Sequence, residues 1–307
     1  MIVVVCPGQG SQTPGFLTPW LAEPSFADRL AGLSEAAGID LGTHGTESDA
    51  DTIRDTAVAQ PLIVAAGILA FDALTAEGRV SGIGGIAGHS VGEITAAAAT
   101  GILDDAGAMR FVAARGRAMA DAAALVPTGM SAVIGADEAD LLGRLDGLGL
   151  EPANFNGGGQ VVVAGAVDAL EQLRSEPPTG ARVIPLQVAG AFHTRYMQPA
   201  RERLAEVAAS LSVSDPGVTL WTNRDGSKVA SGAEFVDLLV GQVASPVRWD
   251  RCMESFAAEG ITGLIELAPA GALVGLAKRA LKGVPTVAVK TPDDLPAAIE
   301  LLEQAAA

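Results

Sequence analysis

The sequence predicts an α/β fold in which a large domain with a parallel sheet carries a second, smaller domain inserted into it. Short apolar, strand-like segments alternate with longer helical segments through most of the 307 residues, an order typical of parallel sheets. In the middle of the chain the order changes to β-α-β-β-α-β, which is that of a split, ferredoxin-like unit. We therefore expect the large domain at 1–125 and 190–307 and a ferredoxin-like subdomain at 126–189.

In the large domain the predicted strands are short apolar runs, and the predicted helices are longer Ala-rich or amphipathic segments. Asp104-Asp105 and Pro292-Asp293-Asp294 supply helix start signals. The predicted strands are 2–6, 83–87, 218–221, 261–266 and 285–289. The predicted helices are 57–77, 91–100, 105–121, 195–210, 233–241, 248–259, 270–281 and 293–304.

The inserted subdomain is predicted around a hairpin. The run Asn156-Gly157-Gly158-Gly159 separates two strand-like segments, and Gly-rich turns of this kind connect antiparallel strands. The predicted strands are 130–135, 151–155, 160–164 and 182–186, and the predicted helices are 137–145 and 167–174. The cleft between the two domains is the expected place for a ligand.

Composition and charge exclude several classes of protein. With 20 Lys and Arg against 36 Asp and Glu, the net charge is −16, which argues against nucleic acid or an anionic membrane as a partner. The longest apolar run, 61–71, is shorter than the ~20 residues of a membrane span, and 1–6 has the pattern of a core strand rather than of a signal peptide. Cys6 and Cys252 lie in apolar settings without metal-ligand spacing. We expect a cytoplasmic monomer without a metal or a disulfide.

The most informative motif is Gly88-His89-Ser90-Val91-Gly92, which has the form G-x-S-x-G. A strand-like run precedes it and an Ala-rich helical run follows it, which is the context of a nucleophile elbow. Glycines allow the sharp turn, and a serine at a helix N-terminus lies near amide N–H groups that can receive negative charge. We therefore expect a nucleophilic Ser90 in an α/β-hydrolase-like domain. An ordinary strand-to-helix turn is the alternative.

A nucleophilic serine needs a positioned base, and the chain contains three histidines. His89 adjoins Ser90, so its side chain leaves the turn in another direction, and His44 lies in a predicted surface loop. His193 follows a predicted strand and precedes a predicted helix, and it is the expected general base. A backbone carbonyl can orient an imidazole as well as an Asp can, and no acid stands out among Asp104, Asp105 and Asp121.

A Gly-rich loop, Pro7-Gly8-Gln9-Gly10-Ser11-Gln12, follows the first predicted strand. The dinucleotide fingerprint G-x-G-x-x-G is incomplete, because Thr13 stands where its last glycine would fall. The alternative is an oxyanion hole, in which the amide of Gln9 supplies one N–H and that of Val91, the residue after the nucleophile, supplies the other.

Helical geometry singles out Arg115. At about 100° per residue, Arg110 and Arg117 share a face, whereas Arg115 lies about 140° from Arg110. If the first two face water, Arg115 points into the protein or a cavity, where a guanidinium needs a partner. Two interpretations remain: an internal salt bridge, or a carboxylate of the substrate beside Ser90.

With these motifs in this order, the chain resembles the malonyl-CoA:acyl-carrier-protein transacylases of type II fatty-acid or polyketide synthesis over essentially its whole length. It departs from the family pattern at Val91, where Leu is usual, and at Thr194, where Ser is frequent. The motifs that carry the resemblance are Pro7-Gly8-Gln9-Gly10-Ser11-Gln12, Gly88-His89-Ser90-Val91-Gly92-Glu93, Arg115-Gly116-Arg117-Ala118-Met119, Asn154-Phe155-Asn156, Gly190-Ala191-Phe192-His193 and Gln242-Val243-Ala244-Ser245-Pro246-Val247.

The resemblance implies roles for individual residues. Ser90 would carry a malonyl ester, and His193 would be its base, held by the main-chain carbonyl of Gln242. Arg115 would pair with the free malonyl carboxylate. The oxyanion hole would be formed by Gln9 and Val91, and the substrate would be bound by Phe192, which would fill the space of an α-methyl group, and by Asn154, Asn156 and Met119.

The resemblance also implies partners: malonyl-CoA and holo acyl carrier protein with its phosphopantetheine arm, and no metal or redox cofactor. Carrier proteins are acidic, as is this chain, so docking requires a local basic patch. A serine esterase or thioesterase that uses the same Ser-His pair with water as acceptor is the alternative function. The candidate patches are Lys278-Arg279 with Lys282, and Arg110 with Arg117.

Overall fold

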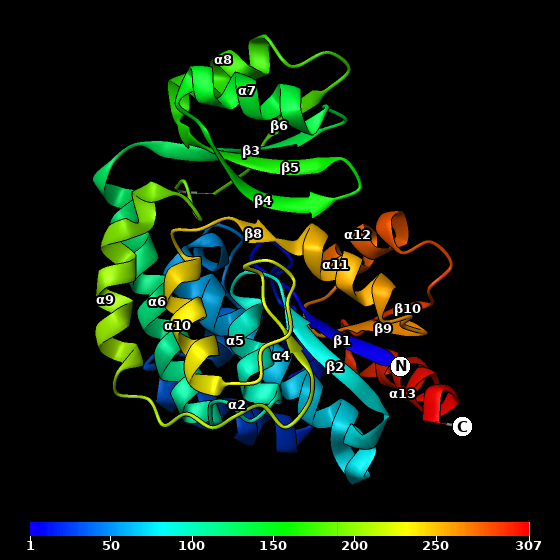
Figure 1. Cartoon of the computed structure of the whole chain (residues 1–307). Helices are drawn as coiled ribbons and strands as arrows, with labels where there is room; N and C mark the ends of the chain where they lie inside the picture. Colours follow the sequence, from blue (N-terminus) through cyan, green and yellow to red (C-terminus); the bar gives the residue numbers. More distant parts are fainter. Residues whose placement is uncertain (189, 307) are drawn as a thin grey trace.

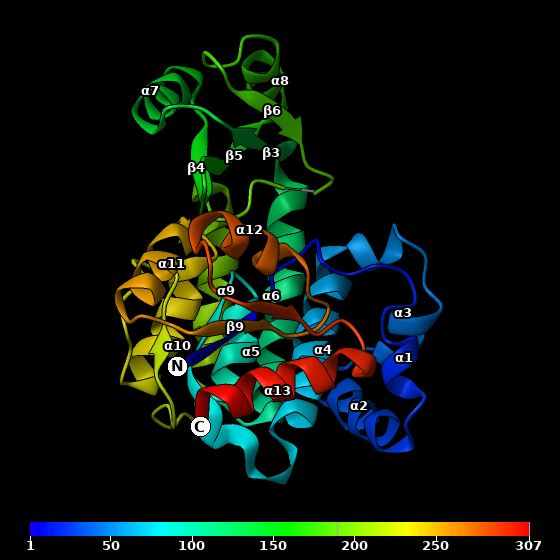
Figure 2. The same ribbon diagram turned by 90° about the vertical axis from the view of Figure 1, so that its right-hand side faces the viewer.

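The computed structural model describes residues 1–188 and 190–306. Among them are two five-stranded sheets, one parallel and one mixed, so the α/β fold predicted from the sequence is confirmed. Both views show the mixed sheet and its helices set above the parallel sheet (Figures 1 and 2). Ala189, at the end of the predicted subdomain, and Ala307 lie outside the described residues.

The parallel sheet has β1 (Ile2–Cys6) at its centre, in the order β10-β9-β1-β2-β7. All five residues of β1 are buried, as expected for a parallel strand covered by helices on both faces. Each of the five strands overlaps with a strand predicted from the sequence. The other four are β2 (Ile83–Gly88), β7 (Leu220–Trp221), β9 (Gly263–Glu266) and β10 (Thr286–Ala288).

Alternate side chains of β1 enter two different hydrophobic cores, because successive residues of a strand face opposite sides. The even-numbered side chains of β1 pack with four helices: α4 (Thr56–Thr75), α5 (Gly92–Ala99), α6 (Asp105–Leu125) and α13 (Leu295–Ala306). Val3 and Val5 pack with two: α11 (Trp249–Ala258) and α12 (Ala272–Ala280).

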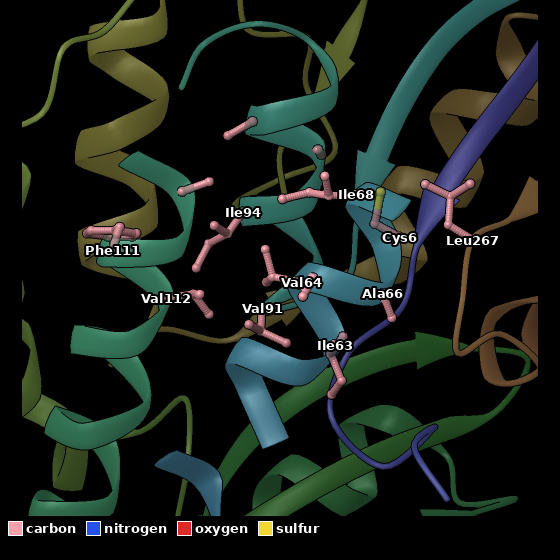
Figure 3. Close-up of a cluster of buried hydrophobic side chains, with 14 of the residues drawn as sticks. Cys6, Ile63, Val64, Ala66, Ile68, Val91, Ile94, Phe111, Val112 and Leu267 are labelled. Atoms are coloured by element: carbon pink, nitrogen blue, oxygen red, sulfur yellow. The ribbon is translucent and has the colours of Figure 1, made fainter. Parts of the chain in front are cut away.

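The helix that begins at the predicted elbow is fixed by the larger of these cores. Figure 3 shows Val91 and Ile94 inside it, with Val64 of α4 on one side and Phe111 and Val112 of α6 on the other. Val91 is 1% exposed and Ile94 is fully buried. The start of α5 therefore has little freedom to move relative to the sheet.

Helix α4 agrees within two residues with the helix predicted at 57–77, and its apolar character extends beyond the run 61–71. Its 20 residues have a mean hydropathy of 1.9 in the most apolar window, enough in length and composition to cross a membrane. Of that window, 72% is buried inside the protein, and α4 packs against α5 and α6. Its apolar character is that of a core helix.

The mixed sheet has the order β6-β3-β5-β4-β8. The strands from the middle of the chain pair antiparallel, and β5 separates β3 from β4, which is the split arrangement predicted for a ferredoxin-like unit. Two helices, α7 (Glu138–Leu148) and α8 (Val167–Ser175), cover one face. The strands are β3 (Thr128–Ile134), β4 (Glu151–Gly157), β5 (Gln160–Ala166) and β6 (Arg182–Pro185).

The fifth strand of this sheet, β8 (Val247–Arg248), comes from outside 126–189 and runs parallel to β4. The sequence analysis placed residue 248 in a helix, but α11 begins one residue later, at Trp249. Two residues carry no periodicity from which a strand can be predicted. Their pairing with β4 attaches the segment before α11 to the edge of the mixed sheet.

Three N-terminal helices were not predicted: α1 (Thr18–Leu21), α2 (Pro24–Ala37) and α3 (Leu41–Thr46). His44 was expected in a surface loop, and that expectation is wrong. It lies half-buried in α3, where its Nδ1 bonds to Ser48 Oγ at 3.0 Å. The remaining helices are α9 (Gln198–Ala208), α10 (Gly232–Gln242) and the short 3₁₀ turns Thr52–Arg54, Ala76–Gly82, Arg195–Met197 and Pro292–Asp294.

Candidate active site

The elbow at Ser90 is a strained turn between β2 and α5. Ser90 has φ +54°, a left-handed conformation that costs free energy for a residue with a side chain and that is concentrated at functional sites. A Cβ at Gly88 would lie 2.1 Å from the backbone of Gly92, and a Cβ at Gly92 would lie 2.1 Å from the carbonyl oxygen of Cys6. Both glycines are therefore required for the turn to pass this close to β1.

His193, 103 residues after Ser90, reaches its hydroxyl. Ser90 Oγ lies 2.7 Å from His193 Nε2, and His193 Nδ1 lies 2.9 Å from the main-chain oxygen of Gln242. The carbonyl can accept a hydrogen bond from Nδ1 only if Nδ1 carries the hydrogen, so the neutral imidazole has Nε2 free to accept the serine proton. His193 is itself in the left-handed region, with φ +62°.

The protonation of His193 is set by its surroundings. The side chain is 4% exposed, and burial, with the positive charge of Arg115, lowers the pKa of His193 to about 3. The imidazole is therefore neutral at physiological pH, as a general base requires.

The acids considered as a third catalytic member lie elsewhere. Asp104 caps α6 by accepting a bond from Gly107 N at 2.6 Å. Asp105 pairs with Arg29, and Asp121 pairs with Arg203. Within 1–188 and 190–306, the group that holds His193 Nδ1 is a carbonyl and no carboxylate.

Arg115 points inward, as its position on the helix predicted. It is 1% exposed, whereas Arg110 and Arg117 are exposed. Its Nη1 donates to Gln60 Oε1 at 2.7 Å, and its Nη2 donates to Gln242 Oε1 at 2.8 Å and more weakly to Ser90 Oγ at 3.4 Å. Its Nε has no hydrogen-bond partner among the described residues.

The partners of the Arg115 guanidinium are thus neutral oxygens, and no direct carboxylate partner is present in the described part of the chain. Burial lowers the pKa of Arg115 to about 10, against the charge of Glu93, which raises it. Arg115 consequently keeps its charge at neutral pH. A buried cation held by neutral side chains is suited to receive a carboxylate from a ligand.

The Gly-rich loop after β1 lies against the elbow. The side-chain amide of Gln9 donates to the carbonyl of Arg54 at 3.3 Å and to Thr56 Oγ1 at 3.4 Å, which ties the loop to the start of α4. The backbone amides of Gln9 and Val91 meet no acceptor among residues 1–188 and 190–306. Free N–H groups on both sides of a nucleophile are what an oxyanion hole requires.

These groups open into a cavity of about 420 Å³ between the two sheets. We call the side formed by Gln9, Ser90, Arg115, Met119, Phe192 and His193 the parallel-sheet wall. The opposite side, the mixed-sheet wall, is formed by Met130, Ala132, Asn154, Asn156, Gln160 and Val162 of strands β3, β4 and β5. All ten residues expected at the site are brought to this cavity or, for Gln242, to Arg115 and His193 behind it.

His89 and Asn156 bridge the two walls. His89 Nε2 lies 3.0 Å from Asn156 Oδ1, and the imidazole packs edge-on against Trp249 with ring centroids 5.6 Å apart. Burial lowers the pKa of His89, so it stays neutral. Its direction, away from Ser90 Oγ and toward β4, agrees with a structural role.

Three further polar residues at the site were not singled out from the sequence. Gln60 holds Arg115 from within the apolar helix α4, Asn223 Oδ1 accepts a bond from Ser90 N at 2.7 Å, and Glu93 is a buried acid one turn after the nucleophile. A lone polar residue in an apolar helix, and a polar residue after a parallel strand, are the signals that point to Gln60 and Asn223. Within the described ranges, no group of three or more His, Cys, Asp or Glu side chains is arranged to hold a metal ion.

Comparison with known proteins agrees with this site. A family model described as the acyl transferase domain matches residues 3–294. The malonyl CoA-acyl carrier protein transacylase of Mycobacterium tuberculosis (strain H37Rv) is 51% identical over 296 residues, which are 96% of this chain and 98% of the relative. The enzyme of the same name from Escherichia coli (strain K12) is 34% identical over 307 residues, covering 97% of this chain and 98% of its own length.

Solved structures show the same likeness. The crystal structure of MCAT from Mycobacterium tuberculosis superposes with a TM-score of 0.94 at 50% identity, covering 97% of this chain and 99% of the other. A complex of a type II PKS acyl-carrier protein with its malonyl-transacylase matches with a TM-score of 0.91 at 31% identity, covering 97% and 99%.

Proposed function

This chain belongs to the acyl transferase family, and we infer that it transfers malonyl groups from malonyl-CoA to the phosphopantetheine thiol of acyl carrier protein, through an ester on Ser90. The observation that carries this function is the contact of Ser90 Oγ with His193 Nε2 at 2.7 Å, beside a buried guanidinium that donates to neutral oxygens. The family and its malonyl-transferring relatives supply the chemistry of the substrate.

In the first half-reaction that we propose, Ser90 Oγ attacks the thioester carbonyl of malonyl-CoA while His193 Nε2 takes the serine proton. The tetrahedral oxyanion accepts hydrogen bonds from the amides of Gln9 and Val91. When this intermediate collapses, the C–S bond breaks, and the departing thiolate takes the proton from His193 and leaves as CoA. The malonyl group remains as an ester on Ser90.

In the second half-reaction the thiol of the carrier protein enters by the same cavity. It gives its proton to His193 and attacks the ester carbonyl, so that a new C–S bond forms and the C–O bond to Ser90 breaks. The alkoxide of Ser90 takes the proton back from His193. Both half-reactions use one base, one nucleophile and one oxyanion hole, which is a ping-pong sequence.

Arg115 is proposed to select the acidic acyl group. Its Nη2 lies 3.4 Å from Ser90 Oγ, close enough for its cationic fork to bind the carboxylate at the other end of a malonyl group on this serine. Phe192, 6% exposed in the cavity, is proposed to occupy the space that an α-methyl group would need. Asn154, Asn156 and Met119 are proposed to line the path of the pantetheine arm.

Mass spectrometry tests this function directly. Incubation with malonyl-CoA should add the mass of one malonyl group to the protein, on the peptide that contains Ser90, and Ser90→Ala should remain unmodified. Holo acyl carrier protein should then discharge the ester and become malonylated, whereas apo carrier protein should not. Loss of the ester to water at the same rate without carrier protein would instead identify an esterase.

We further propose that the chain acts as a cytoplasmic monomer. The apolar helix α4 is a core helix, 72% buried in its most apolar window, which supports a location away from the bilayer. We also propose that 1–125 and 190–307 form the catalytic domain and 126–189 a subdomain that covers it. Sedimentation of the purified protein would test the monomer.

A further inference from the structure

Glu93 is a buried acid that the transfer mechanism does not use. It lies in the first turn of α5, three residues after Ser90, and is 1% exposed. Burial raises the pKa of Glu93, whereas hydrogen bonds from neighbouring donors and the charge of Arg115 lower it and favour the ionised form that accepts at both oxygens. Burying a carboxyl group costs free energy unless the group is hydrogen-bonded. The contacts of Glu93 therefore indicate its role.

Each carboxyl oxygen of Glu93 accepts a bond from a different residue of the site. Oε1 accepts from the backbone amide of Asn223 at 2.6 Å, and Oε2 accepts from the side-chain amide of Gln242. These two residues come from the segment after β7 and from the end of α10. Glu93 is therefore the point at which three separate parts of the chain meet behind the nucleophile.

Gln242 links Glu93 by hydrogen bonds to Arg115 and Ser90, which line the substrate cavity. Its Oε1 accepts from Arg115 Nη2 at 2.8 Å, and its Nε2 donates to the carbonyl oxygen of Ser90 at 3.2 Å as well as to Glu93. A primary amide has one accepting end and one donating end. Only the orientation with Oε1 toward Arg115 matches all three neighbours.

Packing does not impose this orientation. Gln242 and Glu93 line a second cavity of about 490 Å³, which also contains Arg201, Arg224, Asp237 and Arg248 and lies apart from the substrate cavity. The cavity leaves one side of the Gln242 side chain without close packing. Since oxygen and nitrogen ends have nearly the same shape, hydrogen-bond partners must decide which one faces Arg115.

We propose that Glu93 is a positioning residue that holds the Gln242 amide in the orientation in which it presents Arg115 to the acyl carboxylate. An acceptor at Glu93 Oε2 fixes Nε2 of Gln242 on its own side and so leaves Oε1 for Arg115. Specificity for an acidic acyl group then depends on a residue that never touches the substrate. The proposal rests on the inferred malonyl transfer, whose carboxylate Arg115 would bind.

The variant Glu93→Gln replaces the acceptor at Oε2 with an NH₂ donor and keeps the side chain at nearly the same size. The oxygen of the introduced side-chain amide would remain with the fixed backbone amide of Asn223, so its NH₂ would face Gln242. That NH₂ and Nε2 of Gln242 are both donors, and their repulsion would push the Gln242 amide out of its place between Ser90 and Arg115. The guanidinium would lose a charged hydrogen bond and its alignment.

The measurement is kcat/KM for malonyl-CoA and for acetyl-CoA, which lacks the carboxylate. Losing a hydrogen bond to a charged group should lower kcat/KM for malonyl-CoA about 10- to 100-fold, mostly through KM, with acetyl-CoA changed by less than about 2-fold. An equal loss for both substrates would mean that Glu93 only supports the elbow, and would overturn the proposal. So would an unchanged preference.

A matched control is Glu266→Gln. Glu266 is also fully buried, and it accepts bonds from Leu273 N and Val274 N at the start of α12, on the other side of the parallel sheet from α5. It should lower the melting temperature as Glu93→Gln does, but leave the ratio of malonyl to acetyl activity unchanged. If that ratio instead fell in both variants, it would follow stability alone, and the proposal would fail.

A second variant, Gln242→Met, removes the amide itself while keeping a side chain of similar length. It should reproduce the loss of malonyl preference, and the double variant should lose no more than either single one, because both act through the same bond. Additive losses would overturn the proposal. If Glu93→Gln did not fold, a malonyl preference retained in Gln242→Met would be sufficient to reject the proposal.

The malonyl ester on Ser90 keeps this test separate from that of the function. At saturating malonyl-CoA, Glu93→Gln should still form the ester, since Ser90 and His193 are unchanged. Absence of the ester in the wild-type protein would reject the inferred transfer, whereas a wild-type ester with an unaltered Glu93→Gln preference would reject only the role of Glu93.

Discussion

The two walls of the substrate cavity differ in how their residues are connected. On the parallel-sheet wall, Ser90, His193 and Arg115 are linked to one another or to Gln242 by hydrogen bonds, and most are buried. On the mixed-sheet wall, Met130, Ala132 and Val162 present apolar side chains in strand alternation. The polar residues of this wall are Asn154, Asn156 and Gln160.

This difference indicates that the two walls have different functions. A network of buried polar groups holds reacting atoms in place because each member fixes the next, whereas an apolar strand face provides shape and contact area. Substitutions on the parallel-sheet wall should therefore change the rate or the choice of acyl group, and those on the mixed-sheet wall should change affinity. The following predictions, ordered by size of effect, test this contrast.

The largest effect is expected for His193→Ala. Without its base, Ser90 keeps its proton, and kcat for malonyl transfer should fall by roughly 10⁴-fold or more, as for other nucleophile–base pairs that act as a unit. The double variant with Ser90→Ala should be no slower than either single variant. A loss of less than about 10-fold, measured by malonylation of holo carrier protein, would contradict the assignment of His193 as base.

Arg115→Ala should produce the next largest change, and it should depend on the substrate. Leaving a buried carboxylate without its partner costs about 3–5 kcal/mol, so kcat/KM for malonyl-CoA should fall by about 10²- to 10³-fold. Activity toward acetyl-CoA should be retained or rise. Undiminished malonyl preference in this variant would remove Arg115 from substrate selection.

Asn154→Ala tests the opposite wall. Asn154 lines the cavity from β4 and is 7% exposed, so its loss should remove about one neutral hydrogen bond to a substrate and raise KM about 3- to 10-fold. Since both substrates share the pantetheine arm, KM should rise alike for malonyl-CoA and for holo carrier protein, with kcat nearly unchanged. A large fall in kcat would contradict the contrast between the walls.

Charge reversal at the rim should have a smaller effect, confined to the carrier protein. Of the two basic patches named from the sequence, that of Lys278 and Arg279 adjoins the cavity, because Arg279 lines it. Lys278→Glu with Arg279→Glu should raise KM for carrier protein about 3- to 5-fold, less at high salt. The matched control is Arg110→Glu with Arg117→Glu on the outer face of α6, which should leave KM for carrier protein unchanged.

The smallest effect expected is that of pH on the base. Because burial and Arg115 lower the pKa of His193 to about 3, kcat/KM for malonyl-CoA should show no inflection near pH 6.5. An inflection there that persists in His89→Asn would show that the imidazole of His193 titrates near its ordinary pKa and would contradict the burial of the parallel-sheet wall.

Stability gives an independent check on the same group. In the unfolded chain the imidazole has its ordinary pKa of 6.5 and is protonated below that pH. In the folded chain its pKa is about 3, so it is protonated only in much stronger acid. The unfolded state is therefore favoured as pH falls through this window. The stability of the wild type relative to His193→Gln, from urea unfolding, should decrease from about pH 6.5 downward and be constant above it.

Local patterns were sufficient for most of the fold and for naming residues that the structure brings together at the cavity. The apolar run of β2, the glycines at 88 and 92 and the helical run after them specify an elbow, since strand, turn and helix are each decided by neighbouring residues. The inward direction of Arg115 follows from helical spacing alone. The ten residues expected at the site needed only these patterns and a resemblance.

Other features depend on contacts between distant segments. The two residues of β8 form a strand only because β4 lies beside them, and His44 was misplaced because no strong local signal marks the short helix α3. The sequence marks Gln60 and Asn223 only by a polar residue in an apolar helix and a polar residue after a strand. They became site residues because α4 and the end of β7 bring them to Arg115 and Ser90.

The sequence by itself determined the fold class, the elbow and the choice of Ser90, His193 and Arg115, because local periodicity and residue type settle each of these. Only the tertiary structure decided that the Arg115 guanidinium lies 3.4 Å from the nucleophile and that the Gln242 amide faces it. The first contact joins residues 25 positions apart and the second joins residues 127 positions apart. Both depend on burial and on the pairing of donors with acceptors from different elements, which no single position of the chain encodes.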